Sequence, residues 1–423
     1  MPQPNARPCF AILAALLLAW PLQAQSTVWS VALDGSGDAL DIQTAVDLAA
    51  DGDILVVQPG GYPAFVVDGK GLSIFGLSNA AVFQTIPGVD DGPAVTIRNL
   101  SADQSVVLDG FTVFNSLVDV DANLDVQDCA GPVWLQDLFL DSYGAPSLRV
   151  TASSSVVLSD SLAQTNLMPT TPAGDFVPGP GLSAEAGSRI FGHAVTATGS
   201  HGVFFLTGMT PPNAPPSGGA GVQLVDSRGR FEGSDLGGGP GSAFDDDGCT
   251  VGGMGGPGLL VVRTLGGGPA GAVLLQTQAD GGAGGFFDAG CAPPSLPGPD
   301  VELQAGSLTG LPGTSRRLAL PGVATVGQDL TLAFTGEPGD TAWLFASTRA
   351  VPAIEAGPLV IHLDPDALLF LFAHPLPAGS GQVSLPVVAL PPGIDGVVAP
   401  LQALFVDATG GHHVSGPRAV LVR

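Results

Sequence analysis

The apolar positions of this chain first follow the period of a helix and then change to short, strand-like runs. Residues 38–50 carry one apolar stripe at helical spacing, formed by Ile42, Ala45, Val46 and Ala49. Asp38 precedes the stripe as the predicted N-cap, and Asp41 places a second carboxylate in the first turn, where the helix dipole favours negative charge. The pattern predicts one short amphipathic helix.

Three short apolar runs follow this helix. Residues 54–57 are apolar throughout, which is typical of a strand buried on both faces of a parallel sheet. Residues 65–67 and 72–75 predict two further strands, and Gly-rich corners such as Pro59-Gly60-Gly61 separate the runs. Because no second helix intervenes, we expect a chain that winds around an axis rather than one that folds back in hairpins.

Pairs of short apolar strands recur through the next two hundred residues or so, as expected of a repeat protein. The pairs open at Leu124, Leu148, Leu182, Val222 and Leu259, with spacings of 24, 34, 40 and 37 residues. A base period near 24 residues, lengthened by insertions, indicates a solenoid in which stacking of the coils makes the core. We expect about eight to ten coils.

Four insertions lengthen the later repeats and enter each repeat at the same point. They are rich in Gly and Pro and comprise Asn166–Pro180, Thr207–Ala220, Gly237–Pro257 and Thr277–Pro299. Insertions at one position of a repeat project from one face of a solenoid. Two roles stay open: decoration that protects the edge, which is favoured because such loops hold geometry badly, or the wall of a substrate groove.

The pattern changes near residues 313–317. The remainder shows about seven short alternating or apolar segments punctuated by Pro and Gly, which predicts an antiparallel β-sandwich. We therefore expect a solenoid over residues 27–315 and a small β-sandwich domain over residues 316–423.

Residues 42–76, IQTAVDLAADGDILVVQPGGYPAFVVDGKGLSIFG, resemble the opening of right-handed parallel β-helix proteins of the pectin lyase-like superfamily, above all its secreted bacterial members. The resemblance implies an all-β fold, a right-handed parallel β-helix whose N-terminal helix caps the solenoid and whose first coil begins at Asp51. The tail is similar to a C-terminal module found behind β-helices in secreted bacterial proteins. Neither resemblance implies an activity, because one fold carries many functions.

The first 24 residues predict a secretory signal peptide. A short apolar core at residues 11–20 follows the single Arg7, and Leu22-Gln23-Ala24 forms an acceptable cleavage site. No later run is long enough for a membrane helix, so we expect a secreted protein without membrane insertion.

Three cysteines remain after the predicted signal peptide. Cys249 and Cys291 lie in the similar loops FDDDGCTVGG and FFDAGCAPPS, so we expect a disulfide between them. Cys129 is expected to be a buried free thiol.

The charge balance excludes several partners. Charged residues make up 12% of the chain, the formal net charge is −25, and Lys70 is the only lysine. Such a surface repels nucleic acid and anionic membranes, and polyuronates unless a cation bridges. The expected partner is a polysaccharide or another cell-surface component, bound by a monomer. Trp134 and Trp343 are the main aromatic candidates beside Trp29, and no spaced aromatic platform for stacking sugars is evident.

Aligning the repeats places polar residues in a column. Asp137, Asp160 and His193 occupy matching positions, with Glu232 near the next one, and stacked coils lie about 4.8 Å apart. Two carboxylates at this separation match the roughly 5 Å of retaining glycosidases, and histidine can act as a general acid or base. The alternative, which we favour, is that these residues sit at coil corners, where they face water or cap backbone groups.

Asp245, Asp246 and Asp247 are the candidate metal site. Carboxylate oxygens suit Ca²⁺, although the three residues lack the alternating spacing of a continuous Ca²⁺ loop and a solvated acidic loop is the simpler explanation. No other cofactor is expected.

Two functions remain open. Patterns similar to those of polygalacturonases and pectin methylesterases are absent, which favours a non-catalytic extracellular structural or recognition module. The alternative is a polysaccharide hydrolase or lyase with its groove along the loop-bearing face.

Overall fold

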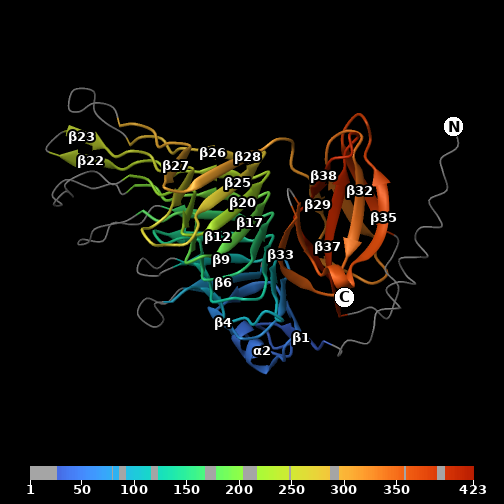
Figure 1. Cartoon of the computed structure of the whole chain (residues 1–423). Coiled ribbons are helices and arrows are strands. Elements are labelled where there is room, and N and C mark those ends of the chain that lie inside the picture. Colours follow the sequence, from blue (N-terminus) through green and yellow to red (C-terminus); the bar gives the residue numbers. More distant parts are fainter. Residues whose placement is uncertain are drawn as a thin grey trace.

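Three long sheets of parallel strands form the greater part of the molecule (Figure 1). The computed structural model describes residues 26–78, 80–84, 92–115, 122–166, 178–202, 217–246, 249–285, 295–356, 359–387 and 396–423. We label these sheets A, B and C, and each coil passes through them in that order before the next coil begins. The chain is therefore an all-β protein with a parallel β-helix, as the sequence predicts.

The strands of each sheet pair with the equivalent strands of neighbouring coils. Sheet A contains β1 (Val28–Val31), β2 (Ile54–Val57), β5 (Ser73–Gly76), β8 (Val106–Asp109), β11 (Val133–Gln136), β14 (Val156–Ser159), β17 (Arg189–His193), β20 (Arg228–Glu232), β25 (Gly271–Leu275) and β28 (Ser307–Leu311). Sheet B contains β3 (Gly60–Tyr62), β6 (Ala80–Gln84), β9 (Thr112–Asn115), β12 (Phe139–Tyr143), β15 (Leu162–Asn166), β18 (Thr196–Thr198), β21 (Asp235–Gly237) and β26 (Gln278–Asp280). Sheet C contains β4 (Phe65–Asp68), β7 (Val95–Arg98), β10 (Leu124–Gln127), β13 (Leu148–Thr151), β16 (Leu182–Glu185), β19 (Val222–Val225), β24 (Leu259–Val262) and β27 (Val301–Gln304).

The predicted repeat positions form one continuous register. Leu124 pairs with Leu148, Leu148 with Leu182, and the same column continues to Val222 and Leu259. All five side chains are completely buried inside the coils. Sheets B and C have eight strands each, so the described part of the solenoid has eight coils, within the expected range.

A short helix closes the N-terminal end of the solenoid. Helix α2 (Ile42–Leu48) buries the predicted stripe against the first coil. Its N-cap is Asp41, whose carboxylate accepts a hydrogen bond from Thr44 N; Asp38 instead binds Ser30, so the predicted cap was wrong by three residues. The Nζ of Lys70 donates to three carbonyl groups at the C-terminal end of the helix, which stabilises that end.

The insertions enter between sheet B and sheet C, at one corner of the coil. Their described bases are joined by backbone hydrogen bonds of 2.8 Å, from Gly298 through Gly282, Gly256 and Gly239 to Gly219. These glycines allow close approach rather than positive φ: a Cβ on Gly239 would lie 1.8 Å from a carbonyl oxygen. The loop bases are therefore well defined, contrary to the expectation from composition. A hairpin of β22 (Ala243–Asp246) and β23 (Cys249–Gly252) extends from this corner (Figure 1).

The architecture changes after β28, and the tail forms a second all-β domain. One antiparallel sheet contains β29 (Arg317–Ala319), β31 (Leu330–Thr335) and β36 (Gln382–Val387). A second sheet contains β30 (Val323–Ala324), β39 (Arg418–Val422), β37 (Val397–Val406), β32 (Thr341–Ala346) and β35 (Leu369–Pro375), with β38 (His412–Val414) beside β37. The hairpin β33 (Ala350–Ala356) and β34 (Leu359–Leu363) and the 3₁₀ helix η1 (Pro365–Ala367) complete the domain.

The second domain packs on the outer face of sheet A (Figure 1). Trp134, Val157 and Phe191 point outward from sheet A and are almost fully buried in a cluster that includes Val360 and Leu421 of the C-terminal domain. Burying large apolar side chains in this way removes them from water and joins the domains. Among the described residues, no helix has the length and apolarity needed to cross a bilayer.

Candidate functional site

The predicted polar column lies at the corner between sheets A and B. Asp137 and Asp160 follow the paired residues Gln136 and Ser159, so they are neighbours as expected. Both have positive φ, 48° and 50°, in the left-handed region that aspartate tolerates at a tight corner. They turn the chain from one sheet to the next at the corner favoured from the sequence, but their carboxylates bind arginines and not backbone groups, and that of Asp160 is buried away from water.

His193 does not share their position. It pairs with Ser159 on one side and Glu232 on the other, so the expected register was wrong by one residue at this coil. The cause is Gly192, which occupies an inward position where the preceding coil has Leu158. Phe231 from the next coil fills the space, and a Cβ on Gly192 would lie 2.5 Å from its ring. Because Gly192 has no apolar side chain to match Leu158, aligning the repeats by their apolar positions shifts this strand by one residue.

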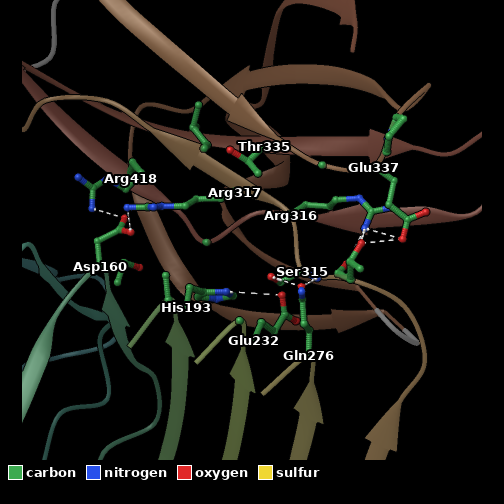
Figure 2. A pocket seen from close by; sticks show the side chains of 18 residues that line it. Asp160, His193, Glu232, Gln276, Ser315, Arg316, Arg317, Thr335, Glu337 and Arg418 are labelled. Carbon is green, nitrogen blue, oxygen red and sulfur yellow. Dashed lines mark hydrogen bonds and ion pairs between the residues drawn. The ribbon is translucent and has the colours of Figure 1, made fainter. Parts of the chain in front are cut away.

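The two carboxylates are bound by arginines of the C-terminal domain. Arg418 from β39 donates to Asp160 at 3.0 Å (Figure 2). It also donates to Asp137, and to Leu320 O at 3.1 Å. Arg317 forms a second ion pair with Asp160. The side chains of Arg418 and Asp160 are only 4% and 8% exposed. The acidic pair is thus part of the interface between the domains, and the loop-bearing corner lies elsewhere on the coil.

Asp109 extends this acidic group by one coil. It pairs with Gln136 in sheet A, is 4% exposed, and lies under Gly322 of the C-terminal domain. Burial raises the pKa of Asp109 to about 7; Asp137 adds to the shift, and Arg418 opposes it. Burial also raises the pKa of Asp160, although Arg418 and Arg317 act in the opposite direction.

His193 and Glu232 form a second buried polar group. The Nδ1 of His193 lies 3.6 Å from Glu232 Oε2, and Arg230 Nε donates to Glu232 Oε1 at 2.6 Å. Burial alone would raise the pKa of Glu232, but contact with His193 and the charge of Arg230 outweigh it and lower the pKa. His362 packs edge-to-face against His193, with ring centroids 6.0 Å apart.

A cavity of about 470 Å³ opens beside these residues at the domain junction (Figure 2). His193, Glu232 and Gln276 line it from the solenoid, and residues 314–318 and 335–338 line it from the C-terminal domain. Most of its polar groups bind one another: Ser315 donates to Gln276 Oε1 at 2.8 and 2.9 Å, and Arg316 pairs with the buried Asp340. Within the described chain, neither ring nitrogen of His193 has a hydrogen-bond partner.

Several groups that can exchange a proton line the cavity, among them His193 and Glu232. A general acid or base must reach the reacting group of a substrate, and the imidazole of His193 lies beside the Glu232 carboxylate in this lining. Asp137 and Asp160 differ from it, because each is already engaged by an arginine. The arrangement favours a structural role for the two aspartates and leaves His193 as the candidate for proton transfer.

Other predicted sites fall partly outside the described residues. Asp245 and Asp246 lie in β22, but their side chains and the whole of Asp247 are outside that range, as is Cys291. The proposed Ca²⁺ site and the Cys249 disulfide thus remain predictions. Where residues are described, no group of three or more His, Cys, Asp or Glu side chains could hold a metal ion. Cys129 is a buried free thiol, as predicted.

The sequence did not reveal the partners contributed by the C-terminal domain. Arg418 lies 281 residues from Asp137, and no local pattern in the last strand indicates that it docks on the solenoid. His362 in β34 is another such partner: it is 0% exposed and packs against Trp134 and Phe191 of the solenoid. Burial lowers its pKa well below the usual range, so this histidine stays neutral in the interface.

The chain was compared with protein families, curated proteins and solved structures. No protein-family model and no curated protein matches the chain. A superoxide reductase (neelaredoxin) from Ignicoccus hospitalis is 11% identical with a TM-score of 0.19, covering 26% of this chain and 80% of that one. Escherichia coli YbhC is 13% identical with a TM-score of 0.32, covering 60% and 72%. The enzymatically active domain of bacteriophage CBA120 tailspike protein 2 is 11% identical with a TM-score of 0.28, covering 90% and 73%.

At such TM-scores, none of these structures indicates what this chain binds or catalyses. The class of protein follows from its own strand pairing: it is a parallel β-helix protein with a C-terminal all-β domain docked on sheet A.

Proposed function

We propose that this chain is a non-catalytic recognition protein that acts outside the cell, with the β-helix as a rigid support for a glycan-binding surface. The observation that carries the proposal is the ion pairing of both Asp137 and Asp160 with Arg418 of the C-terminal domain, with Asp160 buried and Asp137 42% exposed. A glycosidase needs one carboxyl group to protonate the leaving oxygen and another to attack or to activate water, and both must reach the sugar. Asp160 is buried under the C-terminal domain and cannot reach a sugar, so the exposed Asp137 has no second carboxylate of this column to work with.

Further support comes from the sequence. Residues 1–24 have the composition of a signal peptide, and the resemblance of residues 42–76 supports membership in the pectin lyase-like superfamily. Both assignments are part of the proposal.

The test is a panel of soluble polysaccharides incubated with the full chain, with and without Ca²⁺. New reducing ends report hydrolysis, and absorbance of unsaturated uronate products reports lyase activity. The proposal predicts retention of at least one polysaccharide in affinity gels without product above a heat-denatured control. Turnover of any member of the panel would overturn it.

A second function, hydrolysis of a small substrate in the junction cavity, is favoured by the position of the His193 imidazole in the cavity lining beside the Glu232 carboxylate. The matched variants His193→Gln and His374→Gln distinguish this function. A product that disappears only in the His193 variant supports the enzyme, whereas product formation independent of His193 excludes this site.

A further inference from the structure

Aromatic side chains form a row on the outer face of sheet B. Phe83 pairs with Phe114 in the sheet register, and their ring centroids are 6.2 Å apart. Phe114 then meets Tyr143 of the next coil at 5.7 Å, with the rings almost perpendicular. Phe83 packs over Gly61 in β3, where an added Cβ would lie 3.0 Å from its ring. The three rings thus cross successive coils, one per coil, along the axis of the solenoid.

These rings remain accessible. Phe83 is 36% exposed, and Phe139 in the same sheet is 37% exposed; Phe114 and Tyr143 are half-buried. Their counterparts on sheet A, Trp134 and Phe191, are instead covered by the C-terminal domain. Contiguous exposed apolar side chains rimmed by polar groups mark binding surfaces.

Hydrogen-bonding side chains continue the row toward the later coils. Asp141 pairs with Phe114 in register, Gln164 pairs with Asp141, and Thr198 pairs with Gln164. Asn166 donates to the carboxylate of Asp141. This strip offers hydroxyl, amide and carboxylate groups beside the rings, which are the groups that bind sugar hydroxyls.

The charges of this face select the kind of ligand. The described strands of sheet B contain no Arg or Lys, and Asp141, Asp235 and Asp280 carry the formal charge of their outer face. A uronate or a phosphorylated polymer would bring negative charge to a negative surface without a cation to compensate it. An uncharged glycan has no such cost.

We propose that the outer face of sheet B binds an uncharged, extended polysaccharide through the row Phe83, Phe114 and Tyr143, with the chain of sugars parallel to the solenoid axis. The apolar faces of pyranose rings pack on aromatic rings, and neighbouring strands are about 4.8 Å apart, close to the length of one hexose in an extended β-linked chain. The proposal rests on the proposed recognition function and assigns it a surface and a ligand class.

The test measures retardation of the full chain in native gels that contain hydroxyethylcellulose, xyloglucan or polygalacturonate. Two variants remove rings from the row, Phe83→Ala and Phe114→Ala. The control variant Phe370→Ala removes a 44% exposed ring from the C-terminal domain, where it packs on Trp343. Melting temperatures of all variants verify folding.

The proposal predicts retardation by at least one of the two neutral glucans and none by polygalacturonate. Phe114→Ala should weaken binding by about tenfold or more because this ring contacts both of its neighbours, Phe83→Ala should weaken it by less, and Phe370→Ala should leave it unchanged.

Three outcomes overturn the proposal: neither glucan retards the protein, the folded Phe114 variant binds as well as the parent, or only Phe370→Ala abolishes binding. None of these outcomes implies catalysis. The proposed non-catalytic function is overturned by a different result, the formation of product in the polysaccharide panel.

Discussion

Sheets A and B are built by the same coils and meet at one corner, yet the outer face of sheet A is covered and that of sheet B is exposed. On sheet A the outward residues Trp134, Val157 and Phe191 are at most 2% exposed, because the C-terminal domain covers them. On sheet B the outward Phe83 and Phe139 are more than a third exposed. The repeat therefore determines which residues point outward, and a domain far along the chain determines which of them are available to a ligand.

The largest loss of stability is expected for substitution of Arg418, which pairs with the buried carboxylate of Asp160 at the covered face of sheet A. Arg418→Ala would leave the buried carboxylate of Asp160 without its main partner, at a cost of about 3–5 kcal/mol in unfolding free energy. Chemical denaturation measures this loss. Arg98→Ala, which breaks the exposed pair with Asp68, serves as the control and should cost less than about 1 kcal/mol. Equal losses of unfolding free energy in the two variants would mean that the buried ion pair at the interface stabilises the protein no more than an exposed pair does.

A pH profile tests the same face through Asp109. Its folded-state pKa of about 7 lies above the ordinary 3.8, so the folded state binds more protons than the unfolded state between these values. The contribution is present at low pH and is lost as the pH rises through about 7. Stability should decrease by roughly 2–4 kcal/mol between about pH 5 and pH 8, and Asp109→Asn should remove most of that decrease.

The charges of Asp137, Asp160 and Arg418 also act on Asp109, so the measured quantity is the difference between the stability profiles of the parent and the Asp109→Asn variant. Parallel profiles would contradict the assignment of the decrease to Asp109.

The corner between sheets B and C is packed by backbone instead of side chains, which gives a third test. Gly239→Ala places a methyl group 1.8 Å from the carbonyl oxygen of Ser200 and should destabilise the chain by about 1–3 kcal/mol. The nearby Gly237→Ala meets no atom closer than 3.8 Å and should be neutral. Thermal unfolding of the two variants tests whether close approach of the backbone requires glycine at position 239. Identical melting temperatures would exclude this requirement.

The smallest effect on stability is expected on the open face. Phe83→Ala removes a partly exposed ring and should change the unfolding free energy by less than about 1 kcal/mol, in contrast to its effect on glycan binding. Denaturation of this variant alongside Trp134→Ala, which should cost about 3–5 kcal/mol, measures the contrast between the two sheets directly. Comparable losses would show that sheet B is also an internal surface.

The fold was predictable because the local pattern of apolar residues determines the positions of the helix and the strands. The buried column from Leu124 to Leu259 repeats an apolar position that every coil needs, and the helix stripe of Ile42 and Val46 has helical spacing. The site was less predictable. Gly192 removed the side chain that would have set the register of His193, and the partner of Asp160 lies 258 residues away in the sequence. The row of Phe83 and Phe114 was missed because Tyr143 continues it two positions beyond Asp141, the register partner of Phe114.

The most direct test of the account is a double-mutant cycle between Asp160 and Arg418, with Asp160→Asn, Arg418→Met and the double variant in the full chain. If the carboxylate serves the domain interface, the two substitutions should be coupled by about 2 kcal/mol in unfolding free energy. A coupling energy below about 0.5 kcal/mol would show that the pair does not hold the domains together, and would contradict the structural role assigned to the acidic column.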